Sequence, residues 1–106
     1  MSERITPETA MNRLSALKDQ RWVTMFQRGV LELEFYAPRG SDPQQPHTRD
    51  EIYFVLTGAA TFVTGEQRWR VVPGEVIHMP AGQPHRFEEI SDGFSTWAIF
   101  VPNPKT

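Results

Sequence analysis

Two short stretches of the chain hold the residues whose types and spacing could do chemistry. The segment 45–53 contains Gln45, His47 and Glu51, and a second imidazole, that of His85, follows a turn-rich segment further along. If the first segment is extended, its odd-numbered side chains share one face, because a strand alternates with period two. Two imidazoles and one carboxylate form the ligand set that non-haem iron and related divalent metals use.

The elements that must position these residues are mostly short strands. In several segments apolar residues alternate with polar ones, and Gly or Pro residues mark the turns that separate the segments. Eight short strands with closely spaced turns predict an antiparallel sandwich or small barrel. We expect strands at 22–26, 31–35, 52–56, 59–64, 68–72, 76–79, 85–88 and 94–101.

A short helix is expected before the first strand. Thr6 is a suitable N-cap, and Pro7 suits the first helical position. Apolar residues then recur at three- and four-residue spacing, which places them on one helix face: Ala10, Met11, Leu14 and Leu17. The pattern predicts a helix that covers part of the sheet.

Length and composition limit the classes of protein. The 106 residues suffice for one domain, and the absence of cysteine excludes disulfides and thiolate ligands. Eleven basic and thirteen acidic residues give a net charge of −2 without a basic cluster, so we expect no nucleic-acid partner. There is neither a signal-like N-terminus nor an apolar run of membrane-spanning length, so we expect a cytoplasmic protein without a membrane partner.

The segments 40–58 and 74–89 resemble the two motifs of the cupin superfamily, the small germin-like β-barrels. The first motif is matched by Gly40, Gln45, His47, Glu51 and Gly58. The second is matched by Gly74, Pro80, Gly82 and His85, with Glu89 where Asn is common. The resemblance implies an all-β fold, an antiparallel double-stranded β-helix or jelly-roll barrel over residues 21–106, after an N-terminal helix and lead-in at 1–20. It also implies a divalent metal inside the barrel, held by His47, Glu51 and His85.

One ligand position departs from the family pattern. Gln45 stands where the family has the first His, and an amide oxygen is a poorer donor than an imidazole nitrogen for zinc, copper and nickel. Gln45 is then a weak fourth ligand, or a group that orients a bound water. The ion expected is iron, manganese, nickel or zinc, and manganese or iron would suffer least from the exchange.

Three functions are compatible with these residues. An oxidoreductase of the dioxygenase type fits the two-His, one-carboxylate set best, with a small organic molecule as substrate and His47, Glu51 and His85 as the catalytic residues. Without a metal, His47 and His85 could serve as general acid and base, as in cupin epimerases, isomerases and dehydratases. The third possibility is a cupin that binds or senses a small molecule without turnover.

Further residues are candidates for contact with a substrate. Tyr53 has the same parity as Glu51 and should face the cavity, and Gln45 lies beside the metal ligands. His78, Phe87 and Trp97 are candidate cavity walls, although each also suits an ordinary structural position.

The opposite face of the strand at 52–56 bears on assembly. Ile52, Phe54 and Leu56 would point outward, and a strand that is apolar on both faces must be covered on both. The N-terminal helix could cover some of this face. The remainder predicts a homodimer formed by sheet-to-sheet packing, which the resemblance to cupins also implies.

Overall fold

The structure is a computed structural model that describes residues 2–44 and 46–101. One helix, α1 (Pro7–Ser15), precedes eight strands. They are β1 (Trp22–Arg28), β2 (Leu31–Tyr36), β3 (Asp50–Thr57), β4 (Ala60–Thr64), β5 (Gln67–Val71), β6 (Val76–Met79), β7 (Arg86–Glu88) and β8 (Ser95–Val101). All eight predicted strands and the helix are present, with bounds shifted by a few residues.

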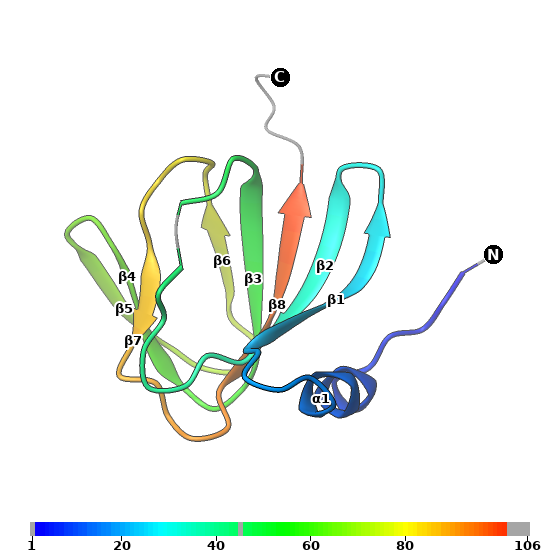
Figure 1. Ribbon diagram of the computed structural model, residues 1–106. Coiled ribbons are helices and arrows are strands. Elements are labelled where there is room, and N and C mark those ends of the chain that lie inside the picture. Colours follow the sequence, from blue (N-terminus) through cyan, green and yellow to red (C-terminus); the bar gives the residue numbers. More distant parts are fainter. Residues whose placement is uncertain (1, 45, 102–106) are drawn as a thin grey trace.

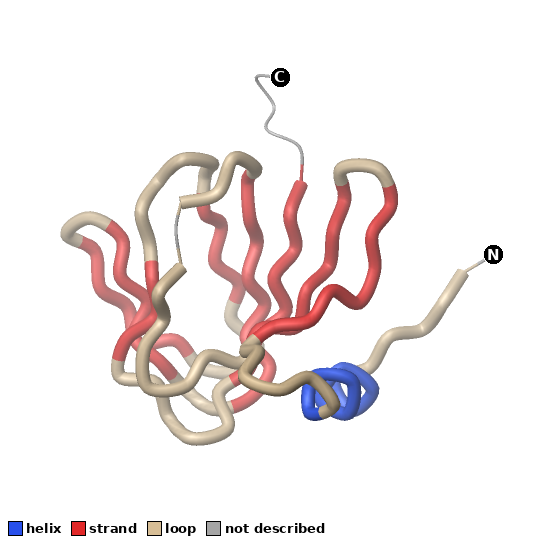
Figure 2. Tube along the Cα trace, in the orientation of Figure 1, coloured by secondary structure: helices blue, strands red, loops and turns tan. Residues whose placement is uncertain are grey.

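The strands form two antiparallel sheets. Five strands pair in the order β1-β2-β8-β3-β6, and three pair in the order β5-β4-β7. Figure 1 shows the two sheets side by side, with the loop between β2 and β3 crossing the space between them. Figure 2 shows that strands and the loops and turns between them make up the chain after the helix. The predicted all-β jelly-roll fold with a short N-terminal helix is confirmed.

The space between the sheets is filled by aromatic and aliphatic side chains. These residues are buried and come from both sheets: Tyr53, Val55, Ala60, Phe62, Val71, Ile77, Met79, Phe87, Phe94, Ala98 and Phe100. The rings of Tyr53, Phe62 and Phe87 pack edge to face, with centroids 5.0–5.8 Å apart. Since β3 is paired on both sides, by β8 and β6, its inward side chains sit on a rigid support.

Helix α1 covers the outer face of the five-stranded sheet at β1 and β2. Thr6 caps the helix, accepting from the backbone N–H of Thr9 at 3.1 Å, as the sequence predicts. Ala10 and Leu14 are buried against a second core cluster that includes Val23 and Phe35. No helix in the described part of the chain is long and apolar enough to cross a membrane.

Gly58, which joins β3 to β4, is a position where only glycine fits. Its φ of +71° lies in the left-handed region, and a Cβ there would come within 2.7 Å of the Phe94 Cα. Gly29, in the turn between β1 and β2, has a similar φ of +59° but open space around it. Alanine at Gly29 would meet only the strain of the left-handed backbone, whereas alanine at Gly58 would meet both that strain and the clash with Phe94.

We predict that Gly58→Ala lowers the free energy of unfolding by about 3 kcal/mol, because strain and overpacking add at this position. Gly29→Ala, which meets only the left-handed strain, should lower it by about 1 kcal/mol. Urea denaturation of both variants checks this. Equal losses would show that contact with Phe94 imposes no constraint.

Part of the outer sheet face lies beyond the helix. Phe54 on β3 and Val76 on β6 are register partners and are 41% and 59% exposed. The homodimer therefore stays a prediction, with these side chains in its interface. Light scattering after size-exclusion chromatography at micromolar concentration should give twice the chain mass, and Phe54→Glu should shift it to the monomer. A monomeric wild type would contradict the prediction.

Candidate metal centre

Glu51 and Tyr53 enter the site from the inner face of β3. Alternation along the strand places them inward and Ile52 and Phe54 outward. Both inward side chains are buried, Glu51 at 2% and Tyr53 at 0% exposure. A carboxylate this deeply buried requires partners, because desolvation of an unpaired charge is costly.

His47 reaches the site from the loop before β3. Its imidazole is half-buried, and its Nε2 lies 3.5 Å from Glu51 Oε1. The His47 carbonyl accepts a hydrogen bond from the Gly82 N–H at 2.7 Å. This bond ties the loop that carries the first imidazole to the turn that leads to the second.

His85 lies just before β7, a strand of the other sheet. The ring nitrogen that points away from the site fixes the orientation of its imidazole. Its Nδ1–H donates to the Gln83 carbonyl at 2.8 Å. A neutral ring held in this way turns the lone pair of Nε2 toward the site, which is the arrangement a metal-binding histidine needs. That Nε2 lies 3.2 Å from Glu51 Oε1 and 3.1 Å from the Tyr53 hydroxyl.

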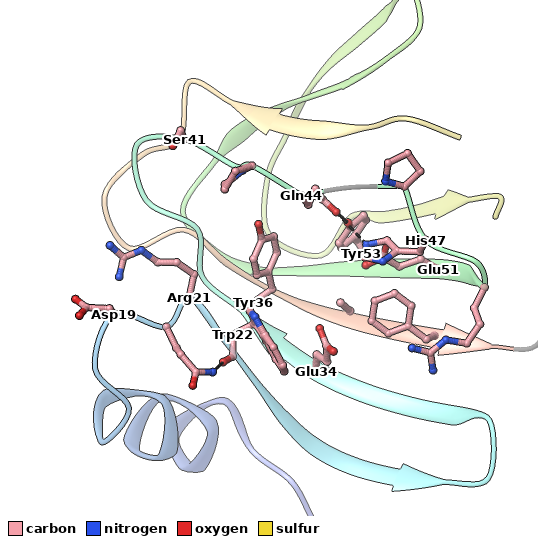
Figure 3. A pocket seen from close by; sticks show the side chains of 16 residues that line it. Asp19, Arg21, Trp22, Glu34, Tyr36, Ser41, Gln44, His47, Glu51 and Tyr53 are labelled. Atoms are coloured by element: carbon pink, nitrogen blue, oxygen red, sulfur yellow. Dashed lines mark hydrogen bonds and ion pairs between the residues drawn. The ribbon is translucent and has the colours of Figure 1, made fainter. Parts of the chain in front are cut away.

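His47, Glu51 and His85 therefore meet as the sequence predicts. One ligand atom from each lies within 4.8 Å of the others. Figure 3 shows His47, Glu51 and Tyr53 directed toward one another, with Gln44 beside them. Two imidazole nitrogens and a carboxylate oxygen suit iron, manganese, nickel or zinc, so the residues present fit a divalent ion.

A proton and a cation would compete for His85. Burial acts to lower the pKa of His85, but the Glu51 carboxylate and the Gln83 carbonyl outweigh it and raise the pKa. The protonated ring donates both N–H groups, one to each partner. A cation needs the neutral ring, so its binding would release this proton.

A cavity of about 540 Å³ opens beside two of the three residues, His47 and Glu51. His47, Glu51 and Tyr53 line it together with Tyr36 and Ala98 (Figure 3). Its volume is within the usual range for small-molecule sites, and its walls combine aromatic surface with a few polar groups. The prediction that Tyr53 faces the cavity is confirmed.

Glu34 is an unusual acid in this cavity. Burial and the neighbouring Glu32 carboxylate raise the pKa of Glu34 to about 8, so its carboxyl is mostly neutral at pH 7. The pKa of Glu32 is shifted in the opposite direction. Burial acts to raise its pKa, but hydrogen bonds from Glu34 and Arg49 outweigh that effect and lower it. The Arg49 guanidinium lies 3.0 Å from Glu32 and also packs over the Phe100 ring.

Three predicted cavity residues lie elsewhere, and these predictions are wrong. His78 is on the outer face of β6, 60% exposed, because Ile77 and Met79 take the inward positions of that strand. Phe87 is buried in the core, with its ring 5.0 Å from that of Tyr53. Trp97 faces outward on β8 and joins the cluster beneath α1.

Gln45, the predicted fourth ligand, lies outside the described residues. Its neighbour Gln44 lines the cavity instead, with its Oε1 3.2 Å from His47 Nε2. Sequence reasoning also missed Glu34 and Tyr36, although a signal was available. Both have the parity opposite to Leu33 and Phe35, and the polar face of a strand inside a barrel lines the cavity.

The fold and this site define a class of protein. Residues 32–101 match the family model described as the cupin domain, and the chain belongs to this family. It is 39% identical over 62 residues to an uncharacterised protein of Streptomyces coelicolor, covering 58% of this chain and 59% of that protein. The chain thus spans less than two thirds of that relative's length.

Two solved structures illustrate the likeness. A protein of unknown function from Rhizobium leguminosarum is 20% identical, with a TM-score of 0.73 over 97% of this chain and 99% of that chain. The DMSP lyase DddQ from Ruegeria pomeroyi is 26% identical, with a TM-score of 0.68 over 80% of this chain and 48% of that chain. The first shows the shared fold, and the second shows that the fold supports a lyase.

The neutral Glu34 carboxyl predicts a pH-dependent stability. Its pKa in the folded protein is above the ordinary value of 4.5, so its stabilising contribution is complete below pH 4.5 and is lost as pH rises through about 8. His85, whose pKa is also raised, acts in the same direction. The free energy of unfolding should therefore fall between pH 5 and pH 8.

Glu34→Gln keeps the shape and cannot titrate, so it should show a clearly smaller fall. One proton corresponds to at most about 1.4 kcal/mol per pH unit, and solvent contact with this carboxyl reduces that figure. Urea denaturation of both proteins across this range is the measurement. Parallel curves would show that Glu34 is ionised in the folded protein.

Proposed function

We propose that this cupin is a metal-dependent enzyme that acts on a small organic molecule. His47, Glu51 and His85 hold a divalent ion, and the substrate occupies the adjoining cavity. The observation that carries the proposal is the meeting of three ligand atoms within 4.8 Å, where two of the three residues, His47 and Glu51, line a cavity of about 540 Å³.

The protein supplies a rigid site whose carboxylate would balance part of the charge of a divalent ion. A bound ion would contribute Lewis-acid activation or dioxygen activation. Glu51 provides the negative charge that a divalent cation needs, and burial removes the water that would screen it. The Gln83 carbonyl keeps the His85 ring oriented, so that little is lost in ordering this ligand.

Strand register indicates where a substrate would lie. Glu34 and Tyr53 both pair with Ala98 of β8, from opposite sides, so one small side chain separates them. The methyl group of Ala98 leaves room for a ligand between these two polar groups. Burial raises the pKa of Tyr53 well above its ordinary value, so its phenol stays protonated. Glu34 can then donate a hydrogen bond to a substrate oxygen, while the Tyr53 hydroxyl donates to Gln44 Oε1.

Two reaction types follow from the site. The two-His, one-carboxylate set favours a dioxygenase. The proton-donating groups around the cavity, with the lyase among the structural relatives, support a lyase or isomerase as the second candidate. Metal-free acid–base catalysis uses the same residues, with the His85 proton shared between Glu51 and the substrate.

Elemental analysis of protein purified without chelators or nickel resin tests the proposal. The wild type should contain stoichiometric iron, manganese, nickel or zinc, and His47→Ala and His85→Ala should lose most of it. His78→Ala is the matched control, because this third histidine lies on the outer face and should leave the metal content unchanged.

A wild type that contains no metal and takes up none of Mn²⁺, Fe²⁺, Ni²⁺ or Zn²⁺ would sink the metal proposal and favour acid–base catalysis. If metal is present, oxygen consumption with candidate substrates separates a dioxygenase from a lyase or isomerase.

A further inference from the structure

Gln44 reaches the candidate metal centre from the loop between β2 and β3. Its Oε1 lies 3.2 Å from His47 Nε2 and accepts a hydrogen bond from the Tyr53 hydroxyl at 3.1 Å. The side chain is partly buried and lines the cavity beside His47 (Figure 3). The amide oxygen is thus in direct contact with a residue of the three-residue group.

We propose that Gln44 is the fourth protein ligand of the metal, through its amide oxygen, and that Asp42 is the residue that positions it. The proposal rests on the proposed function, because it assumes that His47, Glu51 and His85 bind a divalent ion. Gln44 thereby takes the role of fourth ligand, which the spacing of the first motif alone would give to Gln45.

The direction of the Gln44 amide follows from its partners. Asp42 Oδ2 lies 2.5 Å from Gln44 Nε2, and an ionised carboxylate can only accept hydrogen bonds. The amide NH₂ must therefore point at Asp42, which turns the oxygen toward His47 and Tyr53. The Tyr53 phenol, whose raised pKa keeps it protonated, donates to that same oxygen.

Asp42 is itself held firmly. It is 7% exposed and accepts from the backbone N–H of Phe87 at 2.8 Å and from the Tyr36 hydroxyl. With Gln44 this makes three donors for one carboxylate, which accounts for its burial. Asp42 contacts Gln44 directly, so it can set the direction of the Gln44 amide.

The spacing of the donor atoms is close to what one ion would require. Taken in order, they are Gln44 Oε1, His47 Nε2, Glu51 Oε1, His85 Nε2 and the Tyr53 hydroxyl, which returns to Gln44. Successive separations are 3.2, 3.5, 3.2, 3.1 and 3.1 Å. Ligands at right angles around an ion, with bonds of about 2.1 Å, stand about 3.0 Å apart. Small movements would bring the four ligands into place, with Tyr53 as their hydrogen-bond donor.

The position of the loop explains why Gln44 and not the next residue carries this role. Side chains alternate with period two only within a strand, and β3 begins at Asp50, after Gln45. His47 and Gln44 precede β3, in a segment whose side-chain directions are set by its contacts. The contacts given by Asp42 and Tyr53 direct Gln44 to the site.

Manganese affinity tests the assignment, with free Mn²⁺ measured by electron paramagnetic resonance during titration. Gln44→Ala should raise the Mn²⁺ dissociation constant about tenfold or more. Gln45→Ala, the substitution of the neighbouring glutamine, should change it by less than about twofold if Gln44 supplies the fourth ligand.

Asp42→Ala tests the positioning role. Asp42 Oδ2 accepts from both Gln44 Nε2 and the Phe87 N–H, so this variant removes the acceptor that directs the Gln44 amide, and the amide is free to turn over. We expect weaker Mn²⁺ binding and an altered visible absorption spectrum of the Co²⁺-loaded protein. A urea midpoint measured on the same variant reports any loss of fold separately. A Co²⁺ spectrum identical to the wild type would overturn the role of Asp42.

The outcomes separate this assignment from the proposed function. If the wild type binds none of Mn²⁺, Fe²⁺, Ni²⁺ or Zn²⁺, the metal site itself is refuted, and the role of Gln44 with it. If the wild type binds Mn²⁺ and Gln44→Ala binds equally well, only the assignment of Gln44 fails. A larger loss in Gln45→Ala than in Gln44→Ala would overturn it in favour of the neighbouring residue.

Discussion

Burial of the Glu51 carboxylate is the constraint on which the rest of the structure depends. An ionised carboxylate inside a protein is stable only when other groups replace its lost hydration. Here the replacements come from separate parts of the chain, His47 in the loop before β3 and His85 just before β7. The carboxylate thus connects the two sheets. The loop and the turn at Gly82, which are hydrogen bonded to each other, must form together for that connection to exist.

Much of this arrangement could be predicted from the sequence, and the physical reason is periodicity. Glu51 and Tyr53 lie on one strand that alternates regularly, so their common direction follows from their numbers. Alternation does not predict side-chain direction where a strand is apolar on both faces. In β8 alternation alone does not tell whether Trp97 or Ala98 points inward; Trp97 points outward and packs on Phe35 in the cluster that α1 joins. Phe87 does point inward, but it lies in the core between the sheets.

The loop before β3 could not be predicted in the same way. No repeating backbone geometry relates Gln44 to His47, and their contact depends on Asp42, which is held by the backbone of Phe87, 45 residues further along the chain. The neutral state of Glu34 has a similar origin. It depends on how deeply β2 places its two acidic side chains and on the charge of the neighbouring Glu32 carboxylate. The contact of Gln44 with His47 and the raised pKa of Glu34 both depend on residues that are close only in the folded chain, so no local sequence pattern predicts them.

The hydrogen bond between Asp42 and the Phe87 N–H also bears on how molecules enter the cavity. It fastens the loop that forms one wall to a strand of the opposite sheet, at a buried position where water cannot replace a broken bond. A wall attached in this way does not swing outward as a lid would. Entry and release therefore depend on the fixed dimensions of the opening, and a ligand binds without the entropic cost of ordering a mobile segment. Selectivity among compounds would then be changed by substituting side chains at the rim, and much less by altering loop motion.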